Sequence, residues 1–193
     1  MSTTIDPQKQ GKISTGSFEK KVLTSGNKIF APVGVSYIKP KDKIILEVCC
    51  ICIKDLEGKG EEGIIHTEKF WITDKALWRI ANWALSMRNE AAFDCESAQS
   101  IEAIFAKGVC FVGNVEIKID GQYRNVNIRS FSVPSSLIKD GTLTLTNEMS
   151  NYIEQGEEAF PKIISKRREW GVNFLNMNSS DDNVVSIHDE IPF

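Results

Sequence analysis

The chain has 193 residues, of which 41% are hydrophobic, and this content is enough for one folded domain with tails. No apolar run is long enough to cross a membrane and the polar amino-terminal stretch lacks the core of a signal peptide, so a soluble, cytoplasmic protein is expected. The net charge of −3 would argue against a nucleic-acid binder if it were spread evenly. However, residues 181–193 hold four carboxylates and no Lys or Arg. Residues 1–180 therefore carry a net charge of +1, and residues 1–43 alone carry +5.

The first part of the chain joins a charged segment to apolar ones. Residues 1–26 are rich in Lys, Ser, Thr and Gly, which predicts a flexible basic arm. A strand is expected over residues 29–38, ended by a turn with Pro40. Residues 43–53 form a nearly continuous apolar run rich in β-branched side chains, which favours a strand buried on both faces.

A charged loop with several glycines follows at residues 54–63, and a third strand is predicted at residues 64–72. The alternation of this strand places four residues on one face: Ile65, Thr67, Lys69 and Trp71.

A helix is expected next, with Thr73 or Asp74 as its N-cap. Its apolar residues recur at i, i+3, i+4, i+7 and i+8, namely Leu77, Ile80, Ala81, Ala84 and Leu85. Trp78 and Trp83 widen this stripe and are assigned to the core. A second helix is predicted over residues 97–107, with Gly108 at its end.

The chain then returns to a period of two. Residues 109–119 and 122–132 are predicted to form a hairpin around the turn signal Asp120-Gly121. A two-residue turn between these strands pairs Val115 with Val126, Lys118 with Tyr123, and Asn114 with Asn127. Apolar pairs fall on one side and polar pairs on the other, as one buried face requires.

Beyond the hairpin, a further strand is predicted at residues 142–146 and a helix at residues 148–155, followed by Gly156. A second short helix is predicted over residues 161–170. It carries a cationic cluster and an aromatic residue, at Lys162, Lys166, Arg167, Arg168 and Trp170. Residues 173–180, rich in Asn and Ser, are interpreted as a linker.

The order of strand, strand, strand, helix, strand, strand is that of the five-stranded OB barrel, although other small all-β barrels share the strand count. The expected fold class is therefore mainly β with a helical insertion. An OB-type domain is predicted over residues 27–150, with two helices between its third and fourth strands. A helical extension over residues 151–172 and a linker with an acidic tail over residues 173–193 complete the chain.

The tail ends on Asp189, Glu190, Ile191, Pro192 and Phe193. Its segment cannot bury enough apolar surface to offset its ordering entropy, so it is expected to be mobile. An apolar tip beside acids and a terminal carboxylate suits a pocket with a basic rim. The tip closely resembles that of bacterial and phage single-stranded-DNA-binding proteins, where it docks replication and repair enzymes. His188 departs from the purely acidic run usual in that family, which would weaken docking or make it pH-dependent.

Two stretches of the body add a second resemblance: Lys69-Phe70-Trp71-Ile72-Thr73 and Gly121-Gln122-Tyr123-Arg124-Asn125-Val126. They lie within residues 64–131, which are similar to an uncharacterised phage family regarded as OB-type single-strand binders. The resemblances imply a protein of bacterial or phage-infected cytoplasm that coats and protects single-stranded DNA during replication, recombination or repair. They also imply that the tip recruits partner enzymes.

Binding a single strand without reading its sequence needs aromatic faces that stack bases and cations that follow the phosphates. The third strand offers Lys69 and Trp71. The polar side of the final hairpin offers Tyr123, Arg129 and Phe131, with Arg124 on the inward side of the register and able to reach the rim. Loop lysines complete the candidates: Lys39, Lys41 and Lys43 at the first turn, and Lys54 and Lys59 in the next loop. For each, the alternative of a solvated charge or a core aromatic stays open.

No catalytic constellation stands out, so neither enzymatic activity nor a cofactor or metal is expected. Glu57 and Lys59 have the Glu-x-Lys spacing of a metal-dependent nuclease half-site, but they lie in a Gly-rich loop rather than in a strand. The five cysteines match no disulfide or zinc spacing and are expected to be buried free thiols: Cys49, Cys50, Cys52, Cys95 and Cys110.

Two other functions stay open at this point. The protein would anneal strands or mediate recombination if it pairs complementary DNA, and it would be an interaction adaptor if it has no DNA affinity. Under the single-strand-binding interpretation, the resemblance implies that the polyanionic tail competes with DNA for the basic groove. The sequence does not determine the oligomeric state, and a homo-oligomer is compatible with it.

Overall fold

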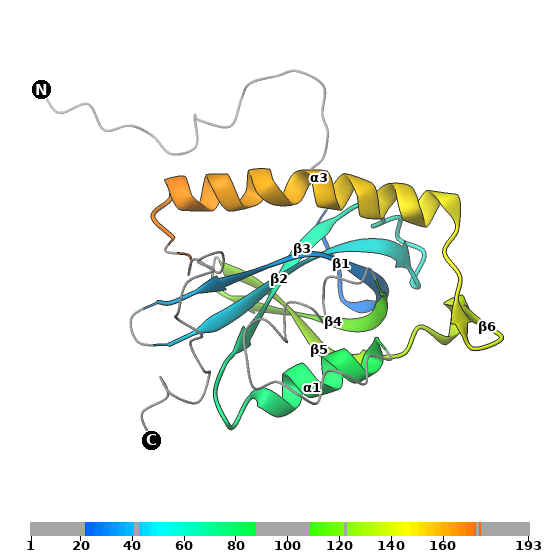
Figure 1. Ribbon diagram of the computed structural model, residues 1–193, viewed down its shortest axis with the longest axis horizontal. Coiled ribbons are helices and arrows are strands. Elements are labelled where there is room, and N and C mark those ends of the chain that lie inside the picture. The colour runs from blue at the N-terminus through cyan, green and yellow to red at the C-terminus, as the bar shows by residue number, and fades with distance from the viewer. Residues whose placement is uncertain (1–21, 41–42, 88–108, 122, 173, 175–193) are drawn as a thin grey trace, which may run out of the picture.

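The computed structural model describes residues 22–40, 43–87, 109–121, 123–172 and 174 (Figure 1). These residues are mainly β, with a five-stranded antiparallel sheet and two α-helices. The strands of the sheet are β1 (Gly26–Ile38), β2 (Ile45–Asp55), β3 (Ile65–Trp71), β4 (Phe111–Asp120) and β5 (Tyr123–Ser132), and the helices are α1 (Leu77–Ser86) and α3 (Asn147–Glu169). No helix in these ranges is long and apolar enough to cross a membrane.

The five predicted strands of the sheet are confirmed, with ends that differ by a few residues. The burial of β2 accounts for its apolar sequence, because every residue from Ile45 to Ile53 is buried. Leu46 and Val48 belong to a core cluster that α1 joins, whereas Ile51 and Ile53 belong to a second cluster under α3. Because each face of β2 packs in a core cluster, the strand has no solvent side and its sequence does not alternate.

The inner core, on the α1 side of the sheet, contains a group of packed aromatic rings. The Trp83 ring stacks on Phe70 at 4.9 Å between centroids and meets the edge of Phe111 at 5.6 Å. The outer core lies between the sheet and α3, which crosses β1 and β2 (Figure 1). The sheet is therefore the middle of three layers.

The sheet is open, with the order β3-β2-β1-β4-β5, so the predicted barrel is not closed by a backbone ladder. Two side chains instead link its edge strands β3 and β5. The Glu68 carboxylate on β3 accepts a hydrogen bond from the Ile128 backbone N–H on β5 at 2.9 Å, and Arg79 from α1 donates to the Ile128 carbonyl at 2.6 Å. Glu68 and Arg79 also pair with each other at 2.8 Å. Side chains thus occupy the position where backbone pairing between β3 and β5 would close a barrel.

The β4–β5 hairpin forms in a different register from the predicted one. Its turn lies one residue further along, at Gly121, whose φ of +57° favours glycine. Val115 consequently faces Ile128 rather than Val126, and Lys118 faces Asn125 rather than Tyr123. Because the register moves by two residues, the buried face of the hairpin is preserved near the turn.

A bulge in β5 changes which residues face the core beyond that point. Val115 pairs with Ile128 and Asn114 with Ser130, so Arg129 is an extra residue with no partner on β4. The alternation of β5 is inverted after it, and Phe131 joins the inner aromatic core at 5.8 Å from Phe70. The assignment of Phe131 to the polar side of the hairpin is therefore wrong, because a bulge breaks the period of two.

Helix α1 is confirmed, but both its start and its buried face differ from the prediction. Its N-cap is Ala76 without a side-chain cap, because residues 73–76 form a turn in which the Thr73 carbonyl accepts from the backbone N–H groups of Ala76 and Leu77. The buried residues of the helix include Ile80, Trp83 and Ala84, whereas Leu85 and Trp78 are exposed. The assignment of Trp78 to the core is wrong.

The two helices predicted near the carboxyl end are one continuous helix, α3. Gly156 does not end it, since the missing side chain lets α3 approach the sheet: a Cβ on Gly156 would lie 2.7 Å from Val33. The converse contact occurs at Gly34 of β1, where the ring of Phe160 from α3 packs in the space that a Cβ would occupy. Close packing against the sheet thus carries the helix past Gly156.

The strand predicted at residues 142–146 is shorter. β7 (Thr142–Leu143) pairs only with β6 (Ile138–Lys139), after the short 3-10 helix η3 (Ser135–Leu137). Thr146 instead caps α3, because its hydroxyl accepts a hydrogen bond from the Met149 backbone N–H at 3.2 Å. Predictions for residues 1–21, for the helix at 97–107 and for the tail at 181–193 lie outside the described residues.

Candidate nucleic-acid interface

The described candidate residues fall into three places. The first is the end of the sheet where β1 and β2 meet, with Lys39, Lys69 and Trp71. The second is the opposite end of β2 and the tip of the β4–β5 hairpin, with Lys54, Lys59, Tyr123 and Arg124. The third is the side of β5 that faces α1, with Arg129 and Phe131. Lys41 lies outside the described residues.

The first place is a surface of cations and exposed indoles, made of Lys43, Lys69, Trp71, Lys166 and Trp170 and called here the basic-aromatic surface. Trp71 is 45% exposed and Trp170 is 69% exposed. Each has a lysine ammonium over its ring, Lys43 at 5.7 Å from the Trp71 centroid and Lys166 at 5.2 Å from that of Trp170. Within the described residues, neither Lys43 nor Lys166 forms an ion pair.

The buried carboxylate of Glu47 joins the two halves of this surface. Arg167 of α3 donates to both Glu47 oxygens, one of them at 2.9 Å, and the Lys69 ammonium on β3 lies 3.7 Å away. Because Glu47 lies on β2, the bidentate pair fixes the end of α3 against that strand. Phe174 adds a second anchor, because it bridges to Ile38 of β1 and lies 5.3 Å from the Arg168 guanidinium. The sequence identified these cations as candidates, but it did not identify the Glu47 carboxylate that holds Arg167 and Lys69 in place.

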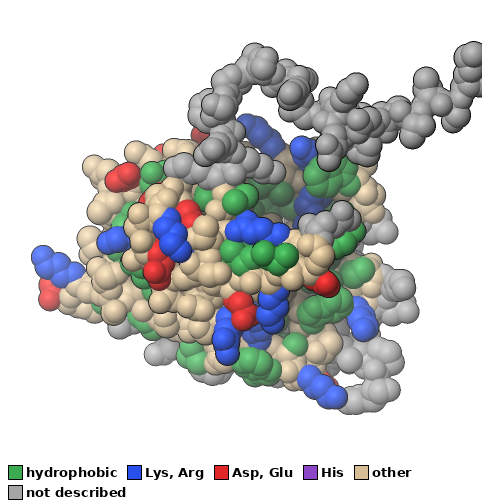
Figure 2. Space-filling model, turned by 180° about the vertical axis from the view of Figure 1, so that it is seen from behind, with side chains coloured by type: hydrophobic (Ala, Val, Ile, Leu, Met, Phe, Trp, Pro, Cys, Tyr) green, Lys and Arg blue, Asp and Glu red, His purple; other side chains and the backbone are tan. Residues whose placement is uncertain are grey.

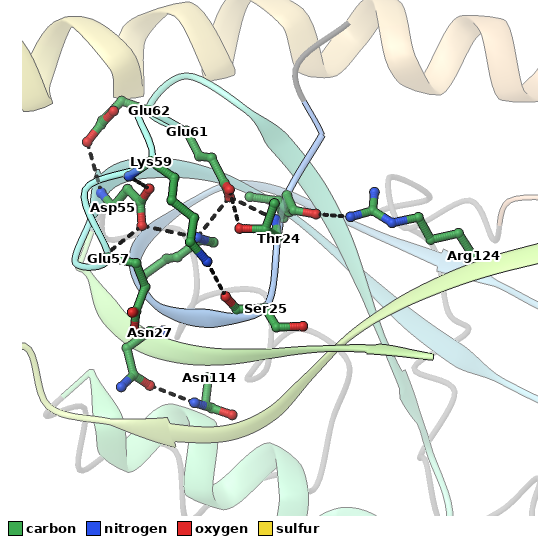
Figure 3. Close-up of polar contacts among 12 residues, drawn as sticks. Thr24, Ser25, Asn27, Asp55, Glu57, Lys59, Glu61, Glu62, Asn114 and Arg124 are labelled. Atoms are coloured by element: carbon green, nitrogen blue, oxygen red, sulfur yellow. Dashed lines mark hydrogen bonds and ion pairs between the residues drawn. The ribbon is translucent and has the colours of Figure 1, made fainter. Parts of the chain in front are cut away.

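The second place is a clamp that ties the start of the fold to the β2–β3 loop (Figure 3). Glu61 accepts from the Thr24 backbone N–H at 2.9 Å and from its hydroxyl, and Glu57 accepts from the Asn27 backbone N–H at 3.1 Å. The Lys59 ammonium donates to the Ser25 carbonyl at 3.0 Å. The folded domain thus begins before residue 27.

A second cation of the clamp is Arg124, whose guanidinium donates to the Leu23 carbonyl. Leu23 itself is buried in the inner core. Arg124 and Lys59 therefore both bind backbone carbonyls of the segment that enters β1, whereas Tyr123 beside Arg124 is 66% exposed. These contacts assign the two cations a structural role, and their contact with DNA stays a prediction.

A fully buried lysine lies at the centre of the clamp. The Lys28 ammonium is 3.1 Å from Asp55 and 2.8 Å from Glu61. Burial alone would lower the pKa of Lys28, but its hydrogen bonds to Glu61 and Asp55 raise it above its ordinary value. Burial alone would likewise raise the pKa of both carboxyl groups, but hydrogen bonds from Lys28 and nearby donors hold them below their ordinary values. The clamp therefore contains a charged, mutually dependent triad.

The third place is a groove of about 430 Å³ between α1 and β5. From α1 it is lined by Trp78, Arg79, Asn82, Leu85 and Ser86, and from β5 and the residue after it by Arg129, Ser130, Phe131, Ser132 and Val133. None of these lining residues is acidic. On the face turned away in Figure 1, Lys and Arg side chains lie among hydrophobic ones (Figure 2).

Sequence reasoning missed Trp78 as a surface residue, although a signal was present. Trp78 and Trp83 are five residues apart, which places them about 140° apart around a helix at 3.6 residues per turn. They cannot both face the same core, and Trp83 takes that place. Trp78 shares the opposite face with Asn82 and Leu85, at i, i+4 and i+7.

The structure offers little support for a thiol nucleophile or a metal centre. Cys49, Cys50, Cys52 and Cys110 are buried and free, as expected. Burial raises the pKa of Cys49 to about 11 and that of Cys52 to about 12, so the reactive thiolate is disfavoured. Among the described residues, no group of three or more His, Cys, Asp or Glu side chains is placed to hold a metal ion.

No model of a protein family matches this chain. No curated protein matches it either.

The five residues of the predicted docking tip, Asp189 to Phe193, lie outside the described residues, as does Cys95.

Proposed function

We propose that this protein binds single-stranded DNA without reading its sequence, and that the basic-aromatic surface is a main part of its binding site. The supporting observation is that two exposed indoles each have a lysine ammonium over the ring, Lys43 over Trp71 and Lys166 over Trp170, on either side of the Glu47–Arg167 contact. Neither lysine forms an ion pair with another residue that the structure describes. Indole rings stack on any base, and ammonium groups contact any phosphate. Such a surface favours a strand whose bases are unpaired, because the bases of a duplex are already stacked.

The arrangement of the sheet supports the same proposal. Three consecutive strands are followed by a helix and by β4, which returns to pair with β1, as in a Greek key. We propose that the fold is an OB-type variant in which Glu68 and Arg79 replace the last backbone ladder. OB-type proteins bind oligonucleotides across the strands that correspond to β2 and β3, where Lys69 and Trp71 lie.

The mechanism would be sequestration rather than chemistry. Lysine ammonium groups displace counterions from the phosphates, and this release supplies most of the affinity. The stacked indoles then hold successive bases apart from a complementary strand. By the resemblance of its tip, the tail would bring replication or repair enzymes to the coated strand, and the protein itself would need no cofactor.

The direct test is fluorescence anisotropy with labelled oligo-dT and with a duplex of the same length. We expect tight binding to the single strand and weak binding to the duplex. If the three lysines of the surface each contact one phosphate, a plot of the logarithm of the affinity against the logarithm of the salt concentration should have a slope of about −2. Absence of any binding at low salt, or equal binding to the duplex, would refute the proposal.

The tail provides a second prediction. A chain that stops at Ser180 loses the four carboxylates of residues 181–193, so it should bind oligo-dT more tightly than the full chain. The same truncation, or Phe193→Ala alone, should abolish binding to partner enzymes in a pull-down from replication extracts, with the alanine variant keeping its DNA affinity. Weaker or unchanged DNA binding by the truncated chain would contradict competition between tail and DNA.

A further inference from the structure

Two residues that line the groove between α1 and β5, Trp78 and Arg129, have exposed side chains that the contacts described above do not explain. Trp78 is 63% exposed and lies at its mouth on α1. Among the residues that the structure describes, Trp78 makes no ring–ring or cation–ring contact, in contrast to Trp71, Trp83 and Trp170. An exposed indole face is therefore available for a planar ligand.

The charge of the groove favours an anionic ligand. The lining residues that the structure describes include Arg79 and Arg129 and no carboxylate. Arg79 is already bound to Glu68 and to the Ile128 carbonyl. Arg129, by contrast, is exposed and forms no ion pair within the described ranges. The bulge in β5 places this residue opposite no partner on β4, and bulges commonly redirect a side chain toward a binding site.

The polar groups of the groove fit a nucleotide better than a wholly apolar ligand. Asn82 contributes an amide, and Ser130 and Ser132 contribute hydroxyl groups, beside the apolar side chains of Leu85 and Val133. An aromatic platform, a cation and a few hydrogen-bonding groups in one open groove match the base and the phosphate of a single nucleotide.

The groove also adjoins the basic-aromatic surface. The Arg79 guanidinium, which lines the groove, donates to the backbone carbonyl of Lys69 on β3 at 3.1 Å. Lys69 in turn belongs to the surface that carries Trp71. A strand bound along β3 would therefore reach the groove by crossing the gap between β3 and β5, where Glu68 and Arg79 link the two strands.

We propose that the groove between α1 and β5 holds one nucleotide of the bound single strand, with its base stacked on Trp78 and its phosphate at Arg129. This inference rests on the proposed function and extends its binding path from the basic-aromatic surface across the β3–β5 gap. It assigns a role to an exposed tryptophan and to a bulged arginine that the fold itself does not require.

The test uses the full chain and a labelled oligo-dT of about 16 nucleotides, long enough to cover both sites. Trp78→Ala should weaken binding by roughly tenfold, while Trp78→Phe should retain most of the affinity because a phenyl ring still stacks a base. Arg129→Ala should lower the magnitude of the salt slope by about 0.7, the value of one phosphate contact on a single strand. The matched controls are Lys139→Ala for charge and Ile119→Ala for exposed apolar area, and both should bind like the unaltered chain.

The outcomes separate the two proposals. If the unaltered chain binds no single strand, the proposed function and this inference both fail. If it binds and Trp78→Ala binds equally well, only the nucleotide site in the groove is refuted, and a protein partner becomes the better occupant. A lower melting temperature of Trp78→Ala would also refute it, since it would show that Trp78 packs within the protein.

Discussion

Replacing Lys28 with Met is expected to lower the free energy of unfolding by about 3–5 kcal/mol, the usual cost of removing one partner of a buried ion pair. Lys28 is fully buried, and its ammonium is the partner of both Asp55 and Glu61. Met has similar length and volume, so the change leaves little cavity. It leaves two buried carboxylates without their cation, and they repel each other.

The pH dependence of this loss follows from the direction of the pKa shifts. The pKa values of Asp55 and Glu61 lie below their ordinary values of 3.8 and 4.5, so their contribution to stability is present above about pH 4.5 and is lost as the pH falls through the lowered values. The pKa of Lys28 is raised above its ordinary value of 10.5, so its contribution is complete below about pH 10.5 and is lost as the pH rises through the raised value. The difference between Lys28→Met and the unaltered protein should therefore be largest near neutral pH and should shrink in acid.

Urea unfolding followed by circular dichroism at pH 7 and near pH 3 measures this difference. Lys54→Met is the matched control, because Lys54 is an exposed lysine on the same end of β2. It should change the stability by less than about 0.5 kcal/mol. Equal stability of the two variants at pH 7 would show that the triad does not hold the clamp together.

The double variant Trp71→Ala/Trp170→Ala is expected to weaken binding to oligo-dT by roughly a hundredfold, since each stacked base contributes about 1–3 kcal/mol. Both rings are exposed, so the folded protein should keep nearly all its stability. The losses of the single variants should add, because the indoles would contact different bases.

The salt dependence distinguishes stacking from charge at this surface. Removing two uncharged rings should leave the salt slope unchanged, whereas Lys43→Ala/Lys166→Ala should lower its magnitude by about 1.4, or 0.7 for each phosphate. Leu56→Ala, which removes an exposed apolar side chain from the β2–β3 loop, is the control for surface area. Oligo-dT affinity of the tryptophan variant within twofold of the control would remove the basic-aromatic surface from the binding path.

Much of the fold could be predicted from local sequence patterns. The uninterrupted apolar run of β2 predicted burial on both faces, and the alternation in β3 placed Lys69 and Trp71 together on one face. The glycine-containing turn predicted the β4–β5 hairpin, although its register moved by two residues. Such patterns succeed because the periods of strands and helices are properties of the backbone itself.

The candidate site was predictable only in part. Lys69 and Trp71 lie on an exposed surface, but Lys59 and Arg124 bind backbone carbonyls in the clamp and Phe131 packs in the core. The sequence shows that a lysine or an aromatic ring is present, yet its availability depends on which distant groups it meets. Trp170 and Trp78 illustrate the converse, because their exposure depends on how α3 and α1 sit against the sheet.

By itself, the sequence determined the five strands of the sheet, the approximate position of α1, the basic and acidic segments and the chemistry of the side chains, since these follow from composition and short-range periodicity. Only the tertiary structure decided three features: the open edge between β3 and β5, the inversion of β5 at Arg129, and the pairing of Glu47 with Arg167. Each joins residues far apart in the chain or inserts one residue into a ladder. The reason is that a buried charge is tolerated only where a distant partner satisfies it, and that the place of a bulge depends on how two strands pair. Neither can be read from the local sequence pattern.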